Sequence, residues 1–255
     1  MKAALPAGRE PLLCYACKAN SNISIIRYLH GLGAGIDAVS MYEVEIALRC
    51  GVPASDILYT PNCVSFEEIE TVVDRGVLVN IDNISVLERF GQKYGARPCA
   101  IRINPHIEAG GNYKISTGHI DSKFGISIHQ MRHIERVVKT TKLNVKGLHM
   151  HTGSEIKDAA VFLRGLEVMF EIARHFDSLE YLDLGSGFKV PYRDDEIETD
   201  VDTLGRQLTD AVKEYETEYG RPLEIWFEPG KYLVSECGSF VVKTNVIKQT
   251  PATVF

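Results

Sequence analysis

Eight short segments rich in Val, Ile and Leu alternate with amphipathic stretches along this 255-residue chain, and this alternation constrains the fold more than any other feature. It is typical of parallel β-α units, because a parallel strand needs a crossover, usually a helix, to return to the same end of the sheet. The expected strands cover residues 12–17, 35–39, 57–60, 78–82, 99–104, 145–151, 179–184 and 223–227. The expected helices cover residues 23–32, 42–50, 66–74, 86–94, 130–140, 159–176 and 203–219.

Eight strands in a chain of this length favour an α/β fold of the TIM-type (β/α)8 barrel over a doubly wound sheet. Glycines lie just past four of the expected helices, where a left-handed cap favours glycine: Gly51, Gly76, Gly95 and Gly220. We therefore expect a barrel over residues 1–238. A ninth strand pattern at residues 239–247 has no place in a closed barrel. We expect residues 239–255 to begin a C-terminal β domain whose remainder is absent from this sequence.

Composition and charge narrow the class of partner. The net charge is -6, and no Lys/Arg cluster stands out that would neutralise phosphates, so we expect no nucleic acid or membrane partner. No apolar run approaches the roughly 20 residues that span a bilayer, and the N-terminus lacks the apolar centre of a signal peptide. These observations predict a cytoplasmic protein that acts on a small molecule.

The cysteines indicate neither a disulfide framework nor a metal site. The chain has 6 cysteines, spread thinly, as expected of reduced thiols. Cys14 and Cys17 form a C-x-x-C, a spacing also found in redox and zinc sites. They lie within a strand pattern, where residues three apart face opposite sides, and no second C-x-x-C completes four ligands. We therefore expect buried structural thiols.

Polar residues cluster where a barrel assembles its active site, at the carboxyl ends of the strands. A lysine buried there would have a lowered pKa and supply the free amine of Schiff-base chemistry, although most such lysines reach into water. The loop after the seventh strand is a recurrent phosphate site, because glycines let backbone N–H groups approach an anion. The candidates in strand order are Lys18, Asp37, Arg102 with Asn104, His149 with His151, Gly185 to Gly187, and Glu228.

The histidine pair leaves a second interpretation open. Period two along a strand places His149 and His151 on one side, as in the metal-binding pair of barrel hydrolases, although either could be a core histidine. The last histidine of the chain is His175, so the later strands offer no further imidazole, and Asp183 is the main remaining acidic candidate. We expect no metal site.

Four motifs in order resemble the fold-type III pyridoxal-phosphate-dependent decarboxylases. They are Tyr15-Ala16-Cys17-Lys18-Ala19-Asn20, His151-Thr152-Gly153-Ser154, Gly185-Ser186-Gly187 and Glu228-Pro229-Gly230-Lys231. Within that family the chain is most similar to the diaminopimelate decarboxylases through three further segments, Arg102-Ile103-Asn104-Pro105, residues 115–118 and Ser122-Lys123-Phe124-Gly125. The resemblance covers nearly the whole chain.

The resemblance implies pyridoxal 5'-phosphate as cofactor and assigns roles to these residues. Lys18 would carry the cofactor as a Schiff base, His151 would stack on the ring, and Glu228 would bind the ring nitrogen. Gly185, Ser186, Gly187 and Ser154 would bind the phosphate, Asp37 and Arg102 would support the cofactor's surroundings, and Pro229, Gly230 and Lys231 would complete the site. The sequence departs from the family at Ser186, where glycine is usual, and at Lys231, which lacks the bidentate fork of the usual arginine.

The implied activity is decarboxylation of an amino acid, meso-diaminopimelate to L-lysine and carbon dioxide, as in lysine biosynthesis. Glutamate at the ring nitrogen keeps it protonated and favours a decarboxylase over the related racemases, which present arginine there. The family also implies a homodimer with shared active sites, completed by the C-terminal domain. Three alternatives stay open: a decarboxylase for ornithine, arginine or carboxynorspermidine, a non-catalytic pyridoxal-phosphate-binding barrel, and a metal-dependent barrel hydrolase.

Overall fold

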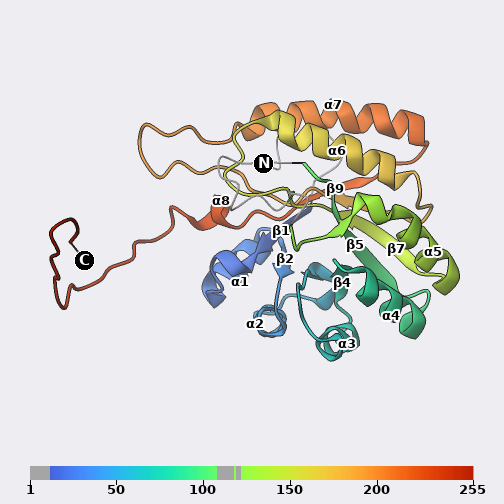
Figure 1. Cartoon of the computed structure of the whole chain (residues 1–255), viewed down its shortest axis with the longest axis horizontal. Coiled ribbons are helices and arrows are strands. Elements are labelled where there is room, and N and C mark those ends of the chain that lie inside the picture. The colour runs from blue at the N-terminus through green and yellow to red at the C-terminus, as the bar shows by residue number, and fades with distance from the viewer. Residues whose placement is uncertain (1–11, 108–117, 119–121, 255) are drawn as a thin grey trace.

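Eight parallel strands close into a barrel in the computed structural model, which describes residues 12–107, 118 and 122–254 (Figure 1). Each strand pairs with the next along the chain, and the last pairs back to the first through Leu12↔Trp226 and Leu13↔Phe227. The strands are β1 (Leu12–Ala16), β2 (Gly35–Ala38), β3 (Ile57–Tyr59), β4 (Leu78–Ile81), β5 (Pro98–Asn104), β7 (Asn144–His149), β8 (Tyr181–Asp183) and β9 (Glu224–Phe227). The predicted (β/α)8 barrel is therefore confirmed. The motif residues 115–117 lie outside the described residues.

Helices follow the strands as the amphipathic pattern predicts. They are α1 (Ile23–Gly31), α2 (Met41–Arg49), α3 (Phe66–Asp74), α4 (Ile84–Tyr94), α5 (Met131–Thr141), α6 (Ala159–Ala173) and α7 (Val201–Tyr219), with the short α8 (Lys231–Val234). Side-chain caps begin several of them, such as Ser65 of α3 and Asn83 of α4. Within the described ranges, none of the helices combines the length and the apolar composition needed to span a bilayer.

Some short elements were not predicted. They are the strand β6 (Ile126–Ser127), which pairs with β5, and the 3-10 turns η2 (Cys17–Ala19), η3 (Ala54–Asp56) and η5 (Ile128–Gln130). The predicted helix at 159–176 ends as α6 at Ala173, because His175 and Phe176 bond to carbonyls three residues back, in a tighter turn. Elements of two to four residues are too short to show a hydrophobic period.

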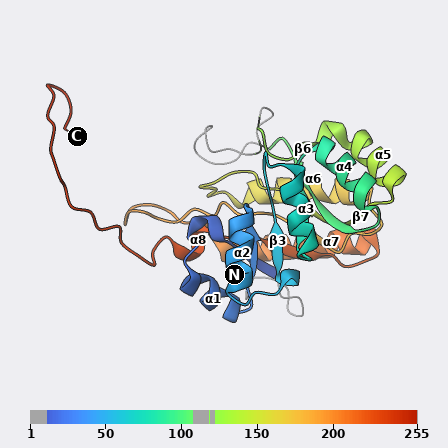
Figure 2. The ribbon, with the colours of Figure 1, turned by 90° about the horizontal axis from the view of Figure 1, so that it is seen from below.

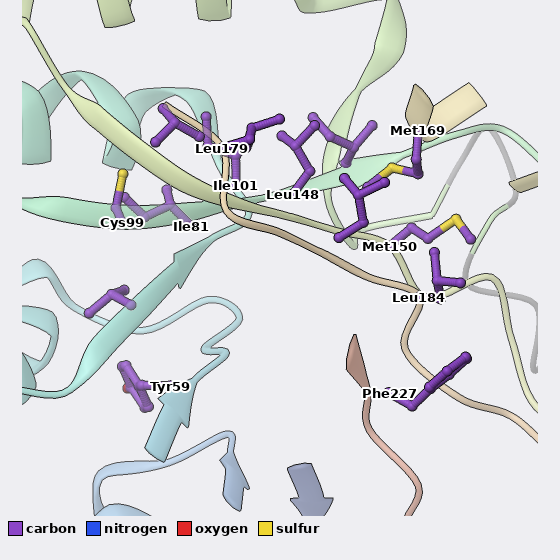
Figure 3. Packing of buried hydrophobic residues seen from close by; sticks show 14 of the residues in the cluster. Tyr59, Ile81, Cys99, Ile101, Leu148, Met150, Met169, Leu179, Leu184 and Phe227 are labelled. Carbon is purple, nitrogen blue, oxygen red and sulfur yellow. The ribbon is translucent and has the colours of Figure 1, made fainter. Parts of the chain in front are cut away.

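The apolar core lies between the strands and the surrounding helices. Figure 3 shows Ile101 and Leu148, from β5 and β7, with Met169 of α6 among these buried side chains. Alternate strand positions face the barrel interior instead, since successive side chains of a strand point to opposite faces. Strand register aligns Arg102 with His149 and His149 with Asp183. The barrel therefore has an apolar outer core and a polar layer inside its carboxyl end.

The predicted strand at residues 239–247 does not form. This segment is exposed, with Phe240 at 94% and Val241 at 89%, and it runs away from the barrel in both views (Figures 1 and 2). A strand needs a partner with free backbone groups, and a closed barrel has no open edge to offer. The assignment of residues 239–255 to a further β domain stays a prediction.

Candidate active site

Lys18 lies directly after β1 and pairs with Asp37 of β2. Its Nζ is 3.1 Å from Asp37 Oδ2, and its side chain is 51% exposed while that of Asp37 is fully buried. Burial alone would lower the pKa of Lys18, but the charges of Asp37 and Glu228 and the hydrogen bond to Asp37 outweigh burial and raise this pKa. The prediction of a lowered lysine pKa is therefore wrong for this arrangement, because the buried carboxylate stabilises the ammonium.

Glu228, just after β9, lies beside two polar residues of the barrel interior. His149 Nε2 is 2.9 Å from Glu228 Oε2, and both side chains are buried. Burial favours the neutral acid, but the charge of His149 and the hydrogen bond with it outweigh burial and lower the pKa of Glu228. Burial and the charge of Glu228 raise the pKa of Asp183 well above its usual range. Glu228 is thus the ionised member and Asp183 the neutral member of this acid pair.

His151 follows the end of β7 and contacts the glycine-containing loop. The backbone N–H of Ser186 donates to His151 Nδ1 at 3.2 Å, so Nδ1 acts as an acceptor. Burial and the positive charges of Arg102 and Lys18 lower the pKa of His151 to about 3. The ring is therefore neutral at ordinary pH, with its proton on Nε2.

The loop after β8 is held tightly against β7 and β9. Its backbone bonds are Gly185 N–H to Asp183 Oδ1, Glu228 N–H to Gly185 O, and Ile156 N–H to Gly187 O, each 2.8 Å long. At Gly187 the φ angle is +107°, and an added Cβ would lie 2.1 Å from Gly153 O. Only glycine fits there, so at Gly187 no side chain stands between the loop backbone and the cavity that it lines.

Lys231 stands at the beginning of α8 and forms an ion pair with Glu155. The second carboxylate oxygen of Glu155 is 2.8 Å from Lys189 Nζ, and Lys189 also contacts Glu196 at 2.6 Å. Ion pairing with two lysines lowers the pKa of Glu155 although burial opposes it. Lys231 is therefore an anchored cation beside the loop.

These groups converge on one cavity of about 200 Å³ at the carboxyl end of the barrel. Of the predicted site residues, eight line it: Lys18, His151, Ser154, Ser186, Gly187, Glu228, Gly230 and Lys231. Asp37, Gly185, Pro229 and Arg102 stand behind this wall. Pro229 O accepts from Ala16 N–H at 3.2 Å, which joins the Glu228 turn to β1. Arg102 is buried 4.6 Å from the ring centre of Phe124, and its charge acts on His151 from there.

Sequence analysis did not assign a site role to several neighbours. The cavity wall also includes Ala16, Ala19, Phe188 and Tyr232. Small and apolar residues carry no chemical signal, so only the geometry identifies them. His149 was considered only as a metal ligand or core histidine, and its contact with Glu228 depends on how β7 and β9 face each other across the barrel.

In the structure, the potential metal-ligating neighbours of His149 are acidic residues and not His151. His149, Asp183 and Glu228 offer potential ligand atoms within 4.8 Å of one another, and His151 belongs to no such group among the described residues. Cys14 and Cys17 are buried free thiols, and burial raises the pKa of both.

Comparison with known proteins identifies the family. The family model described as "Pyridoxal-dependent decarboxylase, pyridoxal binding domain" matches residues 1–235. A diaminopimelate decarboxylase of Methanothermobacter thermautotrophicus is 34% identical over 245 residues, which are 92% of this chain and 57% of that protein. A diaminopimelate decarboxylase of Bacillus subtilis is 32% identical over 264 residues, 98% of this chain and 60% of that protein. The chain thus spans less than two thirds of the length of these relatives.

Solved structures give the same result. The crystal structure of diaminopimelate decarboxylase from Helicobacter pylori complexed with L-lysine matches with a TM-score of 0.81 and 30% identity, over 92% of this chain and 60% of that one. The Methanocaldococcus jannaschii enzyme in co-complex with L-lysine matches with a TM-score of 0.76 and 32% identity, over 97% and 60% of the two chains.

Proposed function

Because this chain belongs to the pyridoxal-dependent decarboxylases through their pyridoxal binding domain, we propose that its cavity binds pyridoxal 5'-phosphate and serves amino-acid decarboxylation. The observation that carries the proposal is the convergence of Lys18, His151, Glu228 and the Gly185–Gly187 loop on one cavity of about 200 Å³. An amine, a flat neutral ring, a carboxylate and a glycine-containing loop match the aldehyde, ring, ring nitrogen and phosphate of this cofactor.

Two observations test the fit of that cofactor. Glu228 lines the cavity and its pKa is lowered, so its carboxylate can accept a hydrogen bond from a protonated ring nitrogen. Gly187 would place any Cβ against Gly153 O, so the loop keeps a bare backbone that suits a phosphate. The residues present therefore fit the group.

Each residue has a defined task in the proposed chemistry. Bound pyridoxal phosphate supplies a ring that accepts the electron pair left when an amino acid loses its α-carboxylate. Lys18 carries the cofactor, and Asp37 Oδ2, at 3.1 Å, is the nearest acceptor for the proton that its Nζ must release. Glu228 keeps the ring nitrogen protonated, which favours decarboxylation. The neutral imidazole of His151 can lie against a cationic ring without charge repulsion.

The anion end of the cavity completes the assignment. Ser154, Ser186 and Gly187 line this part and would hold the phosphate together with Gly185. Lys231 lines the same cavity, and its ion pair with Glu155 fixes it there as a single point charge. Lys231 would contact the phosphate or a substrate carboxylate.

The proposed substrate is meso-diaminopimelate, with L-lysine and carbon dioxide as products. The names of the relatives and the L-lysine in two matching crystal structures support this choice. Homodimeric assembly with shared active sites, implied by the family resemblance, is part of the proposal. So is a C-terminal β domain that begins at residues 239–255.

The test is carbon dioxide release by the purified full-length protein, with its C-terminal domain, supplied with pyridoxal phosphate, from meso-diaminopimelate, ornithine, arginine and carboxynorspermidine in parallel. Carbon dioxide release from meso-diaminopimelate alone supports the proposed substrate. Release from another of these acids instead would contradict that substrate and identify a decarboxylase for the other acid. A visible absorption band that disappears in Lys18→Ala, without release from any acid, would favour a non-catalytic cofactor-binding barrel. Light scattering measures the assembly.

A further inference from the structure

Glu228 uses its two carboxylate oxygens differently, and this asymmetry points to a role for His149. Oε2 is 2.9 Å from His149 Nε2, while Oε1 is buried and the neutral acid Asp183 hydrogen-bonds to the same carboxylate. Glu228 also lines the cavity, whereas His149 lies behind it and is 1% exposed. The imidazole therefore holds one oxygen of this carboxylate from the barrel interior, behind the cavity.

Three acidic residues, Asp37, Asp183 and Glu228, are buried inside the barrel. Each has a different hydrogen-bond partner. Asp37 pairs with the amine of Lys18, and Asp183 Oδ1 accepts the backbone N–H of Gly185. Glu228 has a hydrogen bond to the His149 imidazole. A buried carboxylate without a strong donor takes up a proton, because ionised groups are poorly solvated in a protein interior. The opposite pKa shifts of Glu228, lowered, and Asp183, raised, agree with this distribution.

Strand geometry holds the imidazole in this position. His149 is the last residue of β7, and its register partners are Arg102 on β5 and Asp183 on β8. The preceding residue of β7, Leu148, points into the apolar core on the opposite face of the strand. The donor therefore comes from a rigid strand and not from a mobile loop.

We propose that His149 is a positioning residue which, by donating from Nε2 to Glu228 Oε2, keeps Glu228 ionised and holds its carboxylate in place for the ring nitrogen of pyridoxal phosphate. This inference rests on the proposed cofactor. The contact of His149 acts on the ring nitrogen through Glu228. It does not involve the phosphate or the amine of Lys18.

A matched pair of variants tests the donor. The amide nitrogen of glutamine can take the place of imidazole Nε2, whereas that of asparagine is one methylene too short, so His149→Gln keeps the donor and His149→Asn loses it. The probes are pyridoxal phosphate and its analogue with carbon in place of the ring nitrogen, and the readout is the dissociation constant of each from the full chain. In His149→Asn we expect the affinity for pyridoxal phosphate to fall at least about tenfold, the effect of losing one charge-assisted hydrogen bond.

The carbon analogue separates positioning from general damage. Its affinity should be the same in wild type, His149→Gln and His149→Asn, because it has no ring nitrogen for Glu228 to bind. Leu148→Val is the control for a loss of packing next to His149. It should lower the affinities for pyridoxal phosphate and for the carbon analogue by the same factor, or leave both unchanged. Equal losses for both probes in His149→Asn, or identical behaviour of the two His149 variants, would overturn the inference. A wild-type chain that binds neither probe would instead overturn the proposed function.

Discussion

At the scale of single residues, the barrel interior separates charges by giving each its own partner. Asp37 holds Lys18 as an ammonium, and His149 holds Glu228 as a carboxylate. Asp183 lies beside the charged Glu228 instead of a cation, so burial and the charge of Glu228 keep it neutral. His151 stays neutral because it is buried near two cations. A site with two partnered carboxylates, one ammonium and one neutral ring follows from these local environments.

The Asp37→Asn substitution tests the partner of Lys18. Removing the carboxylate removes the charge and the hydrogen bond that raise the pKa of Lys18, while the burial that lowers it remains. Attachment of pyridoxal phosphate needs the unprotonated amine, so the midpoint of its rate against pH should move to lower pH. Stopped-flow absorbance measures this profile in both proteins. An unchanged midpoint would show that Asp37 does not control the amine.

The low pKa of His151 predicts a histidine that does not titrate in the usual range. With a folded pKa of about 3, the ring should keep one proton between about pH 5 and 8, where an ordinary histidine changes charge. Between these two pKa values only the unfolded chain binds the proton, so this residue favours unfolding as the pH falls below about 6.5. Nitrogen NMR of labelled histidines, assigned with His151→Asn, measures the titration. A midpoint near pH 6.5 would contradict the buried neutral ring.

The positions of the strand-end residues could be predicted from the sequence, but the side chains that they contact could not. Lys18, His151 and Glu228 could be placed on one rim because strand ends in a parallel barrel share one face. The contact between His149 and Glu228 spans 79 positions in sequence, and periodicity does not encode it. The pKa of Lys18 was predicted in the wrong direction, because the effect of burial depends on whether a charge such as Asp37 is buried beside it.

At the scale of elements, the loop after β8 tolerates little change in its backbone. It passes between β7 and β9, and its glycines adopt positive φ angles of 65° at Gly185 and 107° at Gly187. An added Cβ at Gly185 would lie 2.5 Å from Met150 O. The loop is therefore fixed by contact with the backbone of its neighbours as well as by its own hydrogen bonds.

Substituting Gly187 by alanine should destabilise the protein and weaken anion binding. Gly51→Ala is the matched control, since its φ is +89° but an added Cβ there meets no atom within 4 Å. The control should lower the free energy of unfolding by about 1 kcal/mol, from left-handed strain alone. Gly187→Ala should lower it by at least about 2 kcal/mol more, because the backbone must also move. Urea denaturation gives both values, and equal losses would contradict the close approach to Gly153.

The elements themselves were largely predictable from periodicity. Helix boundaries such as those of α3 at Phe66 and Asp74 agree with the sequence prediction, because amphipathic spacing and a serine cap mark them locally. Strand pairing of the segment at residues 239–247 could not be predicted locally, since a β pattern forms a strand only where a partner edge exists.

At the scale of the whole molecule, the barrel closes without the C-terminal segment. Pairing of β9 with β1 completes the circle, and α8 comes immediately after it. Beyond α8, residues 240–249 are exposed, and the hydrogen bonds of Thr250 are to nearby Thr253. Closure of the barrel therefore does not depend on contacts with residues 239–254.

Deleting residues 239–255 should leave the barrel intact. Because no apolar burial is lost, the midpoint of thermal unfolding should stay within about 2 °C of the full chain, and binding of pyridoxal phosphate should be unchanged. Differential scanning calorimetry and cofactor titration measure the two quantities. A clear drop in either would place the boundary of the barrel beyond residue 238.

The central claim is that Lys18 carries pyridoxal phosphate in the cavity at the carboxyl end of the barrel. Reducing the loaded protein with borohydride and mapping the modified lysine by mass spectrometry tests it most directly. The predicted result is one pyridoxyl group per chain, on Lys18, and none in Lys18→Ala. A pyridoxyl group on another lysine, such as Lys231, or a protein that retains none, would contradict the claim.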